Sequence, residues 1–153
     1  MQITQADIGD AELLLELQRA GYQSEARLYN DFNLPPLTQT LEELRASFVD
    51  HTFFKAVVDG DLVGTVRAKV IDTTCHIGRL VVLPDYQRQG IGSALMTAVE
   101  HHFSRVQRFE LFTGEKSEGN IRFYQKLGYH QTKRHVLSEK VVLVFMEKVK
   151  VGK

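Results

Sequence analysis

Cysteine, tryptophan and proline are scarce in this chain: its 153 residues include one cysteine, no tryptophan and three prolines. The one cysteine, Cys75, cannot form an intrachain disulfide, which excludes a disulfide-stabilised scaffold and leads us to expect a reducing, cytoplasmic compartment. Long apolar runs are also absent, since a run such as Val141–Phe145 is far too short to cross a bilayer. The opening sequence, MQITQADIGD, has neither the basic nor the apolar region of a secretory signal. We therefore expect no membrane association.

Net charge is absent too, but the charges are unevenly divided along the chain. Residues 1–66 hold eleven acidic and four basic side chains, whereas residues 67–153 hold fifteen basic and eight acidic ones. This division is typical of a domain that meets two ligands of opposite charge, although it equally suits an ordinary solvated surface. The basic side chains are too sparse for a nucleic-acid site, and no spacing of histidine, cysteine or carboxylates predicts a metal site.

Hydrophobic periodicity predicts one domain over residues 1–153, since the chain is 43% hydrophobic and shows no repeat. Strands are expected at 1–5, 53–58, 62–72, 75–83, 108–114, 129–136 and 141–149, and helices at 10–23, 40–50, 90–103 and 120–128. The expected fold is α/β (α+β), with a mixed central sheet of about seven strands flanked by about four helices.

Individual residues mark several of these boundaries. Pro35 and Pro36 predict a loop or broken helix between the first two helices. Thr40 and Glu43 have the spacing of a capping box, Asn120 is the expected N-cap of the last helix, and Gly128 is expected just past its end.

The stretch RLVVLPDYQRQGIGSALM, residues 79–96, changes character twice. A branched apolar run ends at Pro84, a polar loop follows, and Gly90 and Gly92 then open a helix of small residues. A helix N-terminus carries unpaired N–H groups and partial positive charge, glycine lets an anion come close, and Arg88 adds a full charge. The pattern predicts a phosphate or pyrophosphate site.

Other glycine-rich sites fit this stretch less well. A P-loop is excluded because no lysine follows Gly92. A dinucleotide site is closer, since Gly90 and Gly92 match its first half and Glu110 lies at the expected distance. Leu95, however, replaces its third glycine, and Glu110 lies inside a strand rather than at the strand's end. A further alternative is that this glycine-rich stretch only begins a helix and binds no ligand.

The same stretch is similar to the acetyl-CoA signature of the GCN5-related N-acetyltransferase (GNAT) family. That signature is Arg/Gln-x-x-Gly-x-Gly/Ala after a strand containing Leu-x-Val. Here it is carried by Leu80-Val81-Val82, Pro84 and Gln87-Arg88-Gln89-Gly90-Ile91-Gly92. A second family segment, Asn followed by Phe-Tyr and Gly-Tyr, is matched by Asn120, Phe123-Tyr124 and Gly128-Tyr129. The resemblance is strong over Cys75–Tyr129, and the order of elements agrees over nearly the whole chain.

The resemblance implies a cleft that binds acetyl-CoA, where the sheet splays between the strands expected at 75–83 and 108–114. The residues that it implies for the cofactor are Val81, Val82, Gln87, Arg88, Gln89, Gly90, Ile91, Gly92, Ser93, Asn120 and Tyr124. The backbone of the two valines would bind the pantetheine arm, the amides of the loop would bind the diphosphate, and Tyr124 would point at the sulfur.

Acetyl transfer to an amine needs a base, an oxyanion donor and an acid. A lysine-type amine has a pKa near 10.4, so it must lose a proton before it attacks. The backbone N–H of Val82 is the expected oxyanion donor, and the hydroxyl of Tyr124 is the expected acid for the leaving thiolate. Alone, a tyrosine on a short amphipathic helix is more typical of core packing, so this role depends on the family segment. His76 occupies the position of a family glutamate base, where a partly exposed strand histidine or a water chain are the alternatives.

The resemblance implies that the acidic N-terminal part supplies the acceptor side. We expect Tyr22, Glu25, Tyr29 and Phe32 to bind a primary amine on a small molecule or a peptide, and an acceptor with further positive charge is one of the alternatives. The expected activity is direct N-acetyl transfer in a ternary complex. The alternatives are a non-catalytic acyl-CoA-binding module on the same fold and a dinucleotide binder. A homodimer that pairs residues 141–149 at a sheet edge is a further expectation.

Overall fold

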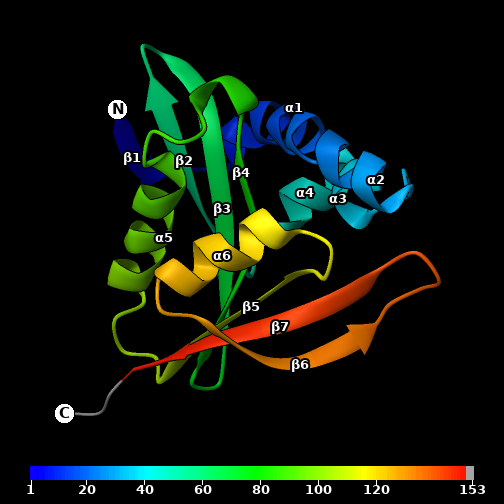
Figure 1. Ribbon diagram of the computed structural model, residues 1–153. Helices are drawn as coiled ribbons and strands as arrows, with labels where there is room; N and C mark the ends of the chain where they lie inside the picture. Colours follow the sequence, from blue (N-terminus) through cyan, green and yellow to red (C-terminus); the bar gives the residue numbers. More distant parts are fainter. Residues whose placement is uncertain (151–153) are drawn as a thin grey trace.

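The computed structural model describes residues 1–150, which form one mixed sheet with helices on both faces (Figure 1). The strands are β1 (Gln2–Gln5), β2 (Thr52–Val58), β3 (Asp61–Ile71), β4 (Thr74–Val82), β5 (Arg108–Gly114), β6 (His130–Val136) and β7 (Val142–Val149). They lie in the order β1-β2-β3-β4-β5-β7-β6, and every neighbouring pair is antiparallel except β4 and β5, which are parallel. The expected seven-stranded mixed sheet is confirmed.

The helices are more numerous than the sequence predicted. They are α1 (Ala11–Gly21), α2 (Gln23–Tyr29), α3 (Pro35–Thr38), α4 (Leu41–Ser47), α5 (Ile91–His102) and α6 (Glu118–Lys126), with 3-10 turns at Ile8–Asp10 and Pro84–Tyr86. The short α3 lies where a loop or broken helix was expected, and α2 lies between that segment and the first predicted helix. Pro35 and Pro36 occupy the first positions of α3, where a missing N–H removes no helical hydrogen bond.

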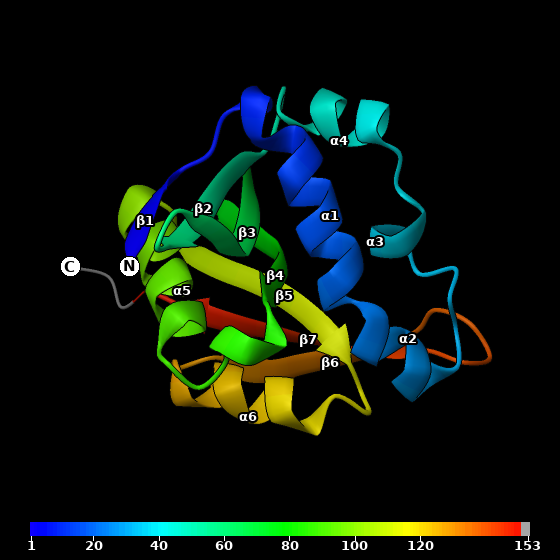
Figure 2. The same cartoon turned by 90° about the horizontal axis from the view of Figure 1, so that it is seen from above.

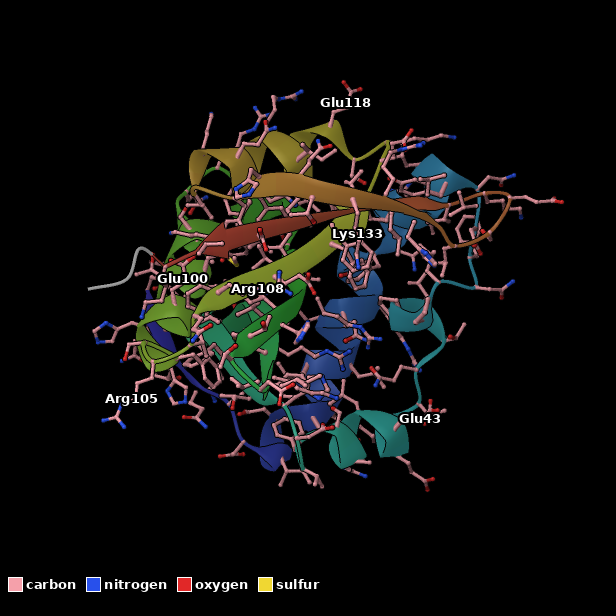
Figure 3. All side chains as sticks on the ribbon, turned by 90° about the horizontal axis from the view of Figure 1, so that it is seen from below. Glu43, Glu100, Arg105, Arg108, Glu118 and Lys133 are labelled. Carbon is pink, nitrogen blue, oxygen red and sulfur yellow. The ribbon has the colours of Figure 1, made fainter. Side chains whose placement is uncertain are left out.

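Capping explains where two of the helices begin and end. The predicted capping box is present: Thr40 Oγ1 accepts from the Glu43 amide at 3.1 Å, and Glu43 Oε1 accepts from the Thr40 amide at 2.8 Å. Glu43 is labelled on the first turn of α4 in Figure 3. The prediction for α6 is wrong at its start, because the N-cap is Ser117 and Asn120 lies inside the first turn. Gly128, with φ of 100°, follows the end of α6 as predicted.

The expectation of an edge pairing through residues 141–149 is wrong. β7 has β5 on one side and β6 on the other, so both of its edges are already hydrogen-bonded. The C-terminal edge of the sheet is β6, all of whose residues are exposed.

The core lies on both faces of strands β2 to β4. Figure 2 shows α1 and α5 on opposite sides of these strands. The larger cluster lies under α5 and α6 and includes Val66, Ala68, Cys75, Ile77, Leu95, Met96, Val99 and Met146. The smaller cluster lies between the sheet and the first helices and includes Leu14, Leu15, Leu44 and Phe53.

Cys75 is fully buried in the larger cluster, and burial raises the pKa of its thiol to about 12. The thiol therefore stays protonated near neutral pH, as expected for a packing residue and not for a nucleophile. Within residues 1–150, no helix has the length and apolar character needed to cross a membrane.

Candidate active site

The sheet opens between β4 and β5. Their parallel pairing has only three registered pairs, Thr74 with Arg108, Cys75 with Phe109 and His76 with Glu110. Beyond His76, β4 continues to Val82 with β3 as its only strand neighbour. An unpaired strand edge can accept an extended ligand through backbone hydrogen bonds, as an added strand would.

A β-bulge in β4 accompanies this separation. Thr65 of β3 pairs with Val81 while Arg67 pairs with Gly78, so Arg79 and Leu80 together oppose a single residue. Arg79 has a left-handed φ of 53°, which is uncommon for a residue with a side chain. A bulge bends its strand and increases the local twist, so it carries the end of β4 away from β5.

The Val82 N–H faces the opening. Leu83 donates its N–H to the carbonyl of Val63 in β3 at 2.9 Å. Successive N–H groups of a strand point to opposite edges, so the N–H of Val82 points away from β3. Its carbonyl lies on the same side and accepts a hydrogen bond from Gln87 Nε2 at 2.9 Å, which ties the following loop to the strand.

The start of α5 forms a cradle of backbone amides at the end of this opening. Gly90, with φ of 83°, precedes the helix, and Arg88 is also left-handed at 63°. No side chain caps the helix, and its first intrahelical bond runs from the Ala94 amide to the Gly90 carbonyl. The amides of the preceding turn, Ile91 to Ser93, therefore have no acceptor within the helix, and such groups bind anions.

α6 closes against this cradle from the other side. A Cβ at Gly92 would lie 3.2 Å from Cζ of Phe123, so the glycine allows the aromatic ring to approach the start of α5. Tyr124 follows Phe123, with its ring centroid 5.2 Å from that ring and 6.0 Å from the ring of Tyr129.

Two partly enclosed tyrosines, Tyr22 and Tyr124, lie near the opening, and Tyr22 acts electrostatically on Tyr124. Burial raises the pKa of Tyr124 well above its ordinary value, and the neighbouring Tyr22 and Glu25 raise it further. Burial likewise raises the pKa of Tyr22 to about 12, although the positive charge of Arg79 opposes this. Both phenols are therefore protonated at neutral pH, and Tyr22, at the end of α1, lies within electrostatic range of Tyr124.

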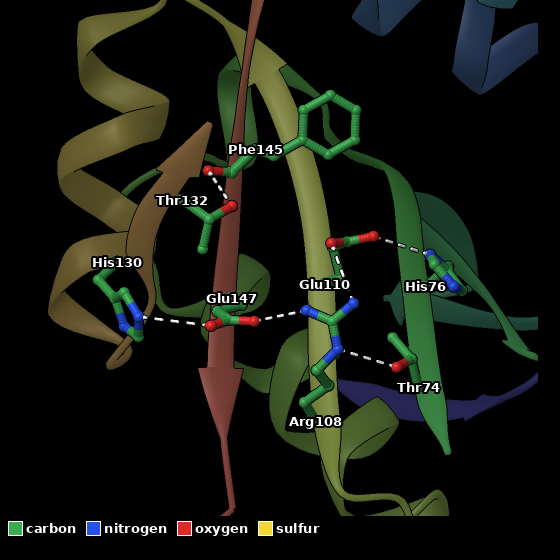
Figure 4. Close-up of polar contacts among 8 residues, drawn as sticks. All are labelled: Thr74, His76, Arg108, Glu110, His130, Thr132, Phe145 and Glu147. Atoms are coloured by element: carbon green, nitrogen blue, oxygen red, sulfur yellow. Dashed lines mark hydrogen bonds and ion pairs between the residues drawn. The ribbon is translucent and has the colours of Figure 1, made fainter. Parts of the chain in front are cut away.

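His76 belongs to a chain of charged side chains at the point where β4 and β5 diverge (Figure 4). Its Nδ1 lies 3.3 Å from Glu110 Oε1. Arg108 Nη2 lies 3.4 Å from the other oxygen of Glu110, and Arg108 Nη1 lies 2.5 Å from Glu147 Oε1. A carboxylate beside one ring nitrogen orients the imidazole and selects its tautomer.

The predicted acceptor residues divide into two groups. Glu25 accepts from Ser117 Oγ at 2.7 Å and from Asn120 Nδ2 at 3.3 Å, so α2 and the start of α6 meet at this carboxylate. They line a pocket of about 330 Å³ formed by Ser24, Glu25, Leu28, Lys116, Ser117, Glu118, Gly119 and Asn120. Tyr29 is 4% exposed, and its hydroxyl is 2.8 Å from Ser117 Oγ, so it supports the pocket from behind. Phe32 is 55% exposed and lies outside the lining.

Sequence reasoning missed four residues of this region. Glu110 was weighed only as a dinucleotide ligand, and Ser117, Arg67 and Arg79 were not considered. The alternation of β5 was a usable signal for Glu110, because it predicts Arg108 and Glu110 on one face. The position of Arg79 depends on the bulge, for which the sequence has no visible signal.

Comparisons with known proteins agree with this geometry. The sequence model of the Acetyltransferase (GNAT) family matches residues 14–129. The chain is 24% identical to the uncharacterized protein YyaT of Bacillus subtilis (strain 168). That alignment covers 95% of this chain and 90% of YyaT. It is 26% identical over 79% of its length to the UPF0157 protein YqkA of the same organism, of which it spans only 35%.

Solved structures share the fold at low identity. The PaiA N-acetyltransferase from Thermoplasma acidophilum, in complex with coenzyme A, superposes with a TM-score of 0.80 and 21% identity, covering 97% of this chain and 98% of that one. The ribosomal-protein-S18-alanine N-acetyltransferase from Escherichia coli gives a TM-score of 0.80 at 15% identity, covering 99% and 96%. The family match includes the opening, the cradle and Tyr124 and spans most of the sequence, and the chain therefore belongs to the acetyltransferase (GNAT) family.

Proposed function

We propose that the protein is a single-domain, acetyl-CoA-dependent N-acetyltransferase that transfers the acetyl group directly to a primary amine of a small molecule or peptide. One observation carries this proposal. The unpaired edge of β4 leads, through one loop, to the uncapped N-terminus of α5. Backbone groups that face outward along this edge, followed by an anion-binding helix start, suit a ligand that has an amide-containing arm and a diphosphate.

The residues present fit coenzyme A. Of the two valines expected at the pantetheine arm, Val82 has backbone groups that face the opening, whereas those of Val81 point to Thr65 of β3. The amides from Gln87 to Ser93 would hold the diphosphate. Gly90 supports this fit, because nothing lies within 4 Å of a Cβ placed there and its left-handed φ keeps the loop open. Asn120 lies at the pocket beside the arm's expected path. When bound, the cofactor supplies a thioester carbonyl that an amine can attack.

The protein's own groups suit the proton movements of that attack. His76, oriented by Glu110, would take the proton of the amine directly or through water. The Val82 N–H faces the opening and would stabilise the oxyanion. Tyr124 is the proposed acid, because burial keeps its hydroxyl protonated and so available to the leaving sulfur.

An amine panel tests the proposal. The purified chain is incubated with acetyl-CoA and a set of polyamines, amino acids and peptides, and release of free thiol is followed. We expect turnover with a subset of the amines and a mass increase of one acetyl group on each acetylated acceptor. Saturable binding of acetyl-CoA without turnover of any amine would favour the non-catalytic acyl-CoA-binding module instead.

A further inference from the structure

Two arginines that play no part in the proposed chemistry lie on adjacent strands. Arg67 is on β3, opposite Gly78, and Arg79 follows Gly78 in the bulge of β4. Val66 and Ala68 pack into the cluster under α5, so Arg67 between them points to the opposite face of the sheet, toward α1 and α4.

The bulge directs Arg79 to the same face. Arg79 Nη1 donates to Gln39 Oε1 at 2.6 Å, and Gln39 lies between α3 and α4 on the α1 side. In a regular strand, position 79 would point to the face opposite that of position 78, which pairs with Arg67. The left-handed φ of Arg79 is a local conformational cost, and it places two guanidinium groups on one side of the sheet.

Neither arginine has a negative partner in the part of the chain that the structure describes. Within residues 1–150, no Asp or Glu oxygen lies within 4.0 Å of either guanidinium. Asp50 attracts Arg67 only weakly, and its oxygens already lie 2.7 Å from His51 and 3.3 Å from Lys69. Burial lowers the pKa of Arg67 to about 10, and the neighbouring positive charge of Arg79 lowers it further.

The contrast with other arginines is informative. Arg108 lies between Glu110 and Glu147, and Arg134 pairs with Glu115 at 2.6 Å. At these two positions, therefore, the arginine forms an ion pair with a carboxylate of the protein itself. Arg67 and Arg79 are themselves half-buried and not fully enclosed.

Tyr22 connects this pair of arginines to the proposed reaction centre. Its phenol lies within electrostatic range of Arg79, Arg67 and Glu25. It also influences Tyr124, the proposed acid. A ligand that spans from the arginines past Tyr22 would have its anionic end at Arg67 and Arg79 and its other end near Tyr124.

We propose that Arg67 and Arg79 bind a carboxylate of the acceptor, so that the acceptor is an amino acid. Two guanidinium groups hold a carboxylate through charge-assisted, bidentate hydrogen bonds. This inference depends on the proposed function and narrows it. Its acceptor is zwitterionic, with the ammonium group on the side of Glu25, whereas a polyamine would have nothing to place against the arginines.

A binding experiment tests this without requiring turnover. The full chain, saturated with coenzyme A, is mixed with each of the N-acetyl-L-amino acids, which mimic the product, or with the matching C-terminal amides. We expect at least one acid to raise the melting temperature while its amide does not. Stabilisation by no acid, or equal stabilisation by acid and amide, would overturn the proposal.

Matched variants locate the effect. Arg67→Gln and Arg79→Gln should each weaken binding of the active acid at least tenfold in calorimetry, and Arg67→Lys should retain part of it. Arg105→Gln is the control, because Arg105 projects outward from the loop after α5 (Figure 3). Wild-type affinity in both glutamine variants would contradict the assignment, and the acid–amide comparison in the unaltered protein remains decisive if a variant does not fold.

Kinetics separate this proposal from the proposed function. We expect the glutamine variants to raise KM for the amino acid at least tenfold and to leave KM for acetyl-CoA unchanged. A rise only in KM for acetyl-CoA would assign the arginines to the cofactor and overturn the proposal. Equal turnover of amino acids and their decarboxylated amines would overturn it too, while leaving the acetyltransferase function intact.

Discussion

The two sides of the opening in the sheet are built in different ways. The side formed by β4 and the start of α5 consists of consecutive residues, and the groups that it presents are backbone amides and carbonyls. The other side is assembled from α2, the loop before α6 and α6 itself, and it presents side chains such as Glu25, Asn120 and Tyr124. We call these the backbone side and the side-chain side.

The difference indicates how each side tolerates substitution. Backbone groups keep their positions when an exposed side chain is changed, provided that the φ and ψ angles are retained. We expect the side-chain side to be more sensitive, because removing one polar atom removes the group that it presents. It also depends on tertiary contacts, since Tyr29 reaches both Ser117 Oγ and the Lys116 amide to hold α2 against the loop.

The largest predicted effect lies on the side-chain side. Tyr124→Phe removes only the hydroxyl that is the proposed acid, so kcat should fall roughly 10²-fold or more, with KM for acetyl-CoA changed little. Steady-state kinetics would measure both constants. Because burial raises the pKa of Tyr124, the gap between wild type and variant should persist at pH 10, where an ordinary tyrosine would begin to lose its proton.

Tyr129→Phe is the matched control for this prediction. Tyr129 lies near Tyr124 in space, but its hydroxyl donates to Glu100 Oε2 at 2.8 Å, away from the proposed chemistry. This variant should lose about 1 kcal/mol of unfolding free energy and keep its kcat. Similar losses of kcat in both variants would argue that Tyr124 acts through packing.

A smaller effect is expected when a glycine of the backbone side, Gly90, is changed to alanine and compared with the same change at Gly60, which lies outside it. Gly90 and Gly60 have φ of 83° and 84°, and a Cβ at either position would meet nothing within 4 Å. Changing either to alanine should therefore cost the same, about 1 kcal/mol of stability. Only Gly90→Ala should also weaken acetyl-CoA binding, by about tenfold, because its methyl group intrudes where the anion approaches. Equal acetyl-CoA affinities in the two variants, measured by calorimetry, would remove Gly90 from the cofactor site.

The smallest effect is expected where a side chain of the backbone side is removed. Gln89 is exposed, and its amide makes only a long bond of 3.4 Å to the Asp85 carbonyl. Gln89→Ala should change the dissociation constant of acetyl-CoA by less than about threefold, since the loop presents its amides without that side chain. A loss as large as that of Gly90→Ala would show that the loop binds through side chains, and the contrast between the two sides would fail.

The same contrast explains what the sequence could predict. The strand, loop and glycines of the backbone side are contiguous, so their pattern is visible in one short stretch and led to the correct fold and family. Gly90 was identified because its backbone conformation and its place before a helix are local properties.

The side-chain side was predicted only in part. Asn120 and Tyr124 were found through a motif, but the contact of Glu25 with Ser117 joins residues 92 positions apart, and no local pattern encodes it. The continuation of the first helix into α2 was missed because its buried face, Ala26 and Tyr29, is satisfied by the loop before α6 and not by neighbours in sequence. The contact of His76 with Glu110 depends on the register between the parallel strands β4 and β5, which the sequence does not show.

Titration calorimetry of the wild-type protein with acetyl-CoA, and in parallel with NAD, tests the central claim most directly. The claim is that the unpaired edge of β4 and the amides at the start of α5 together form a coenzyme A site. We predict a saturable, one-site binding curve with acetyl-CoA, loss of most of that affinity in Gly90→Ala but not in Gly60→Ala, and no saturable binding of NAD. The absence of binding to acetyl-CoA, or equal binding of NAD, would contradict the account.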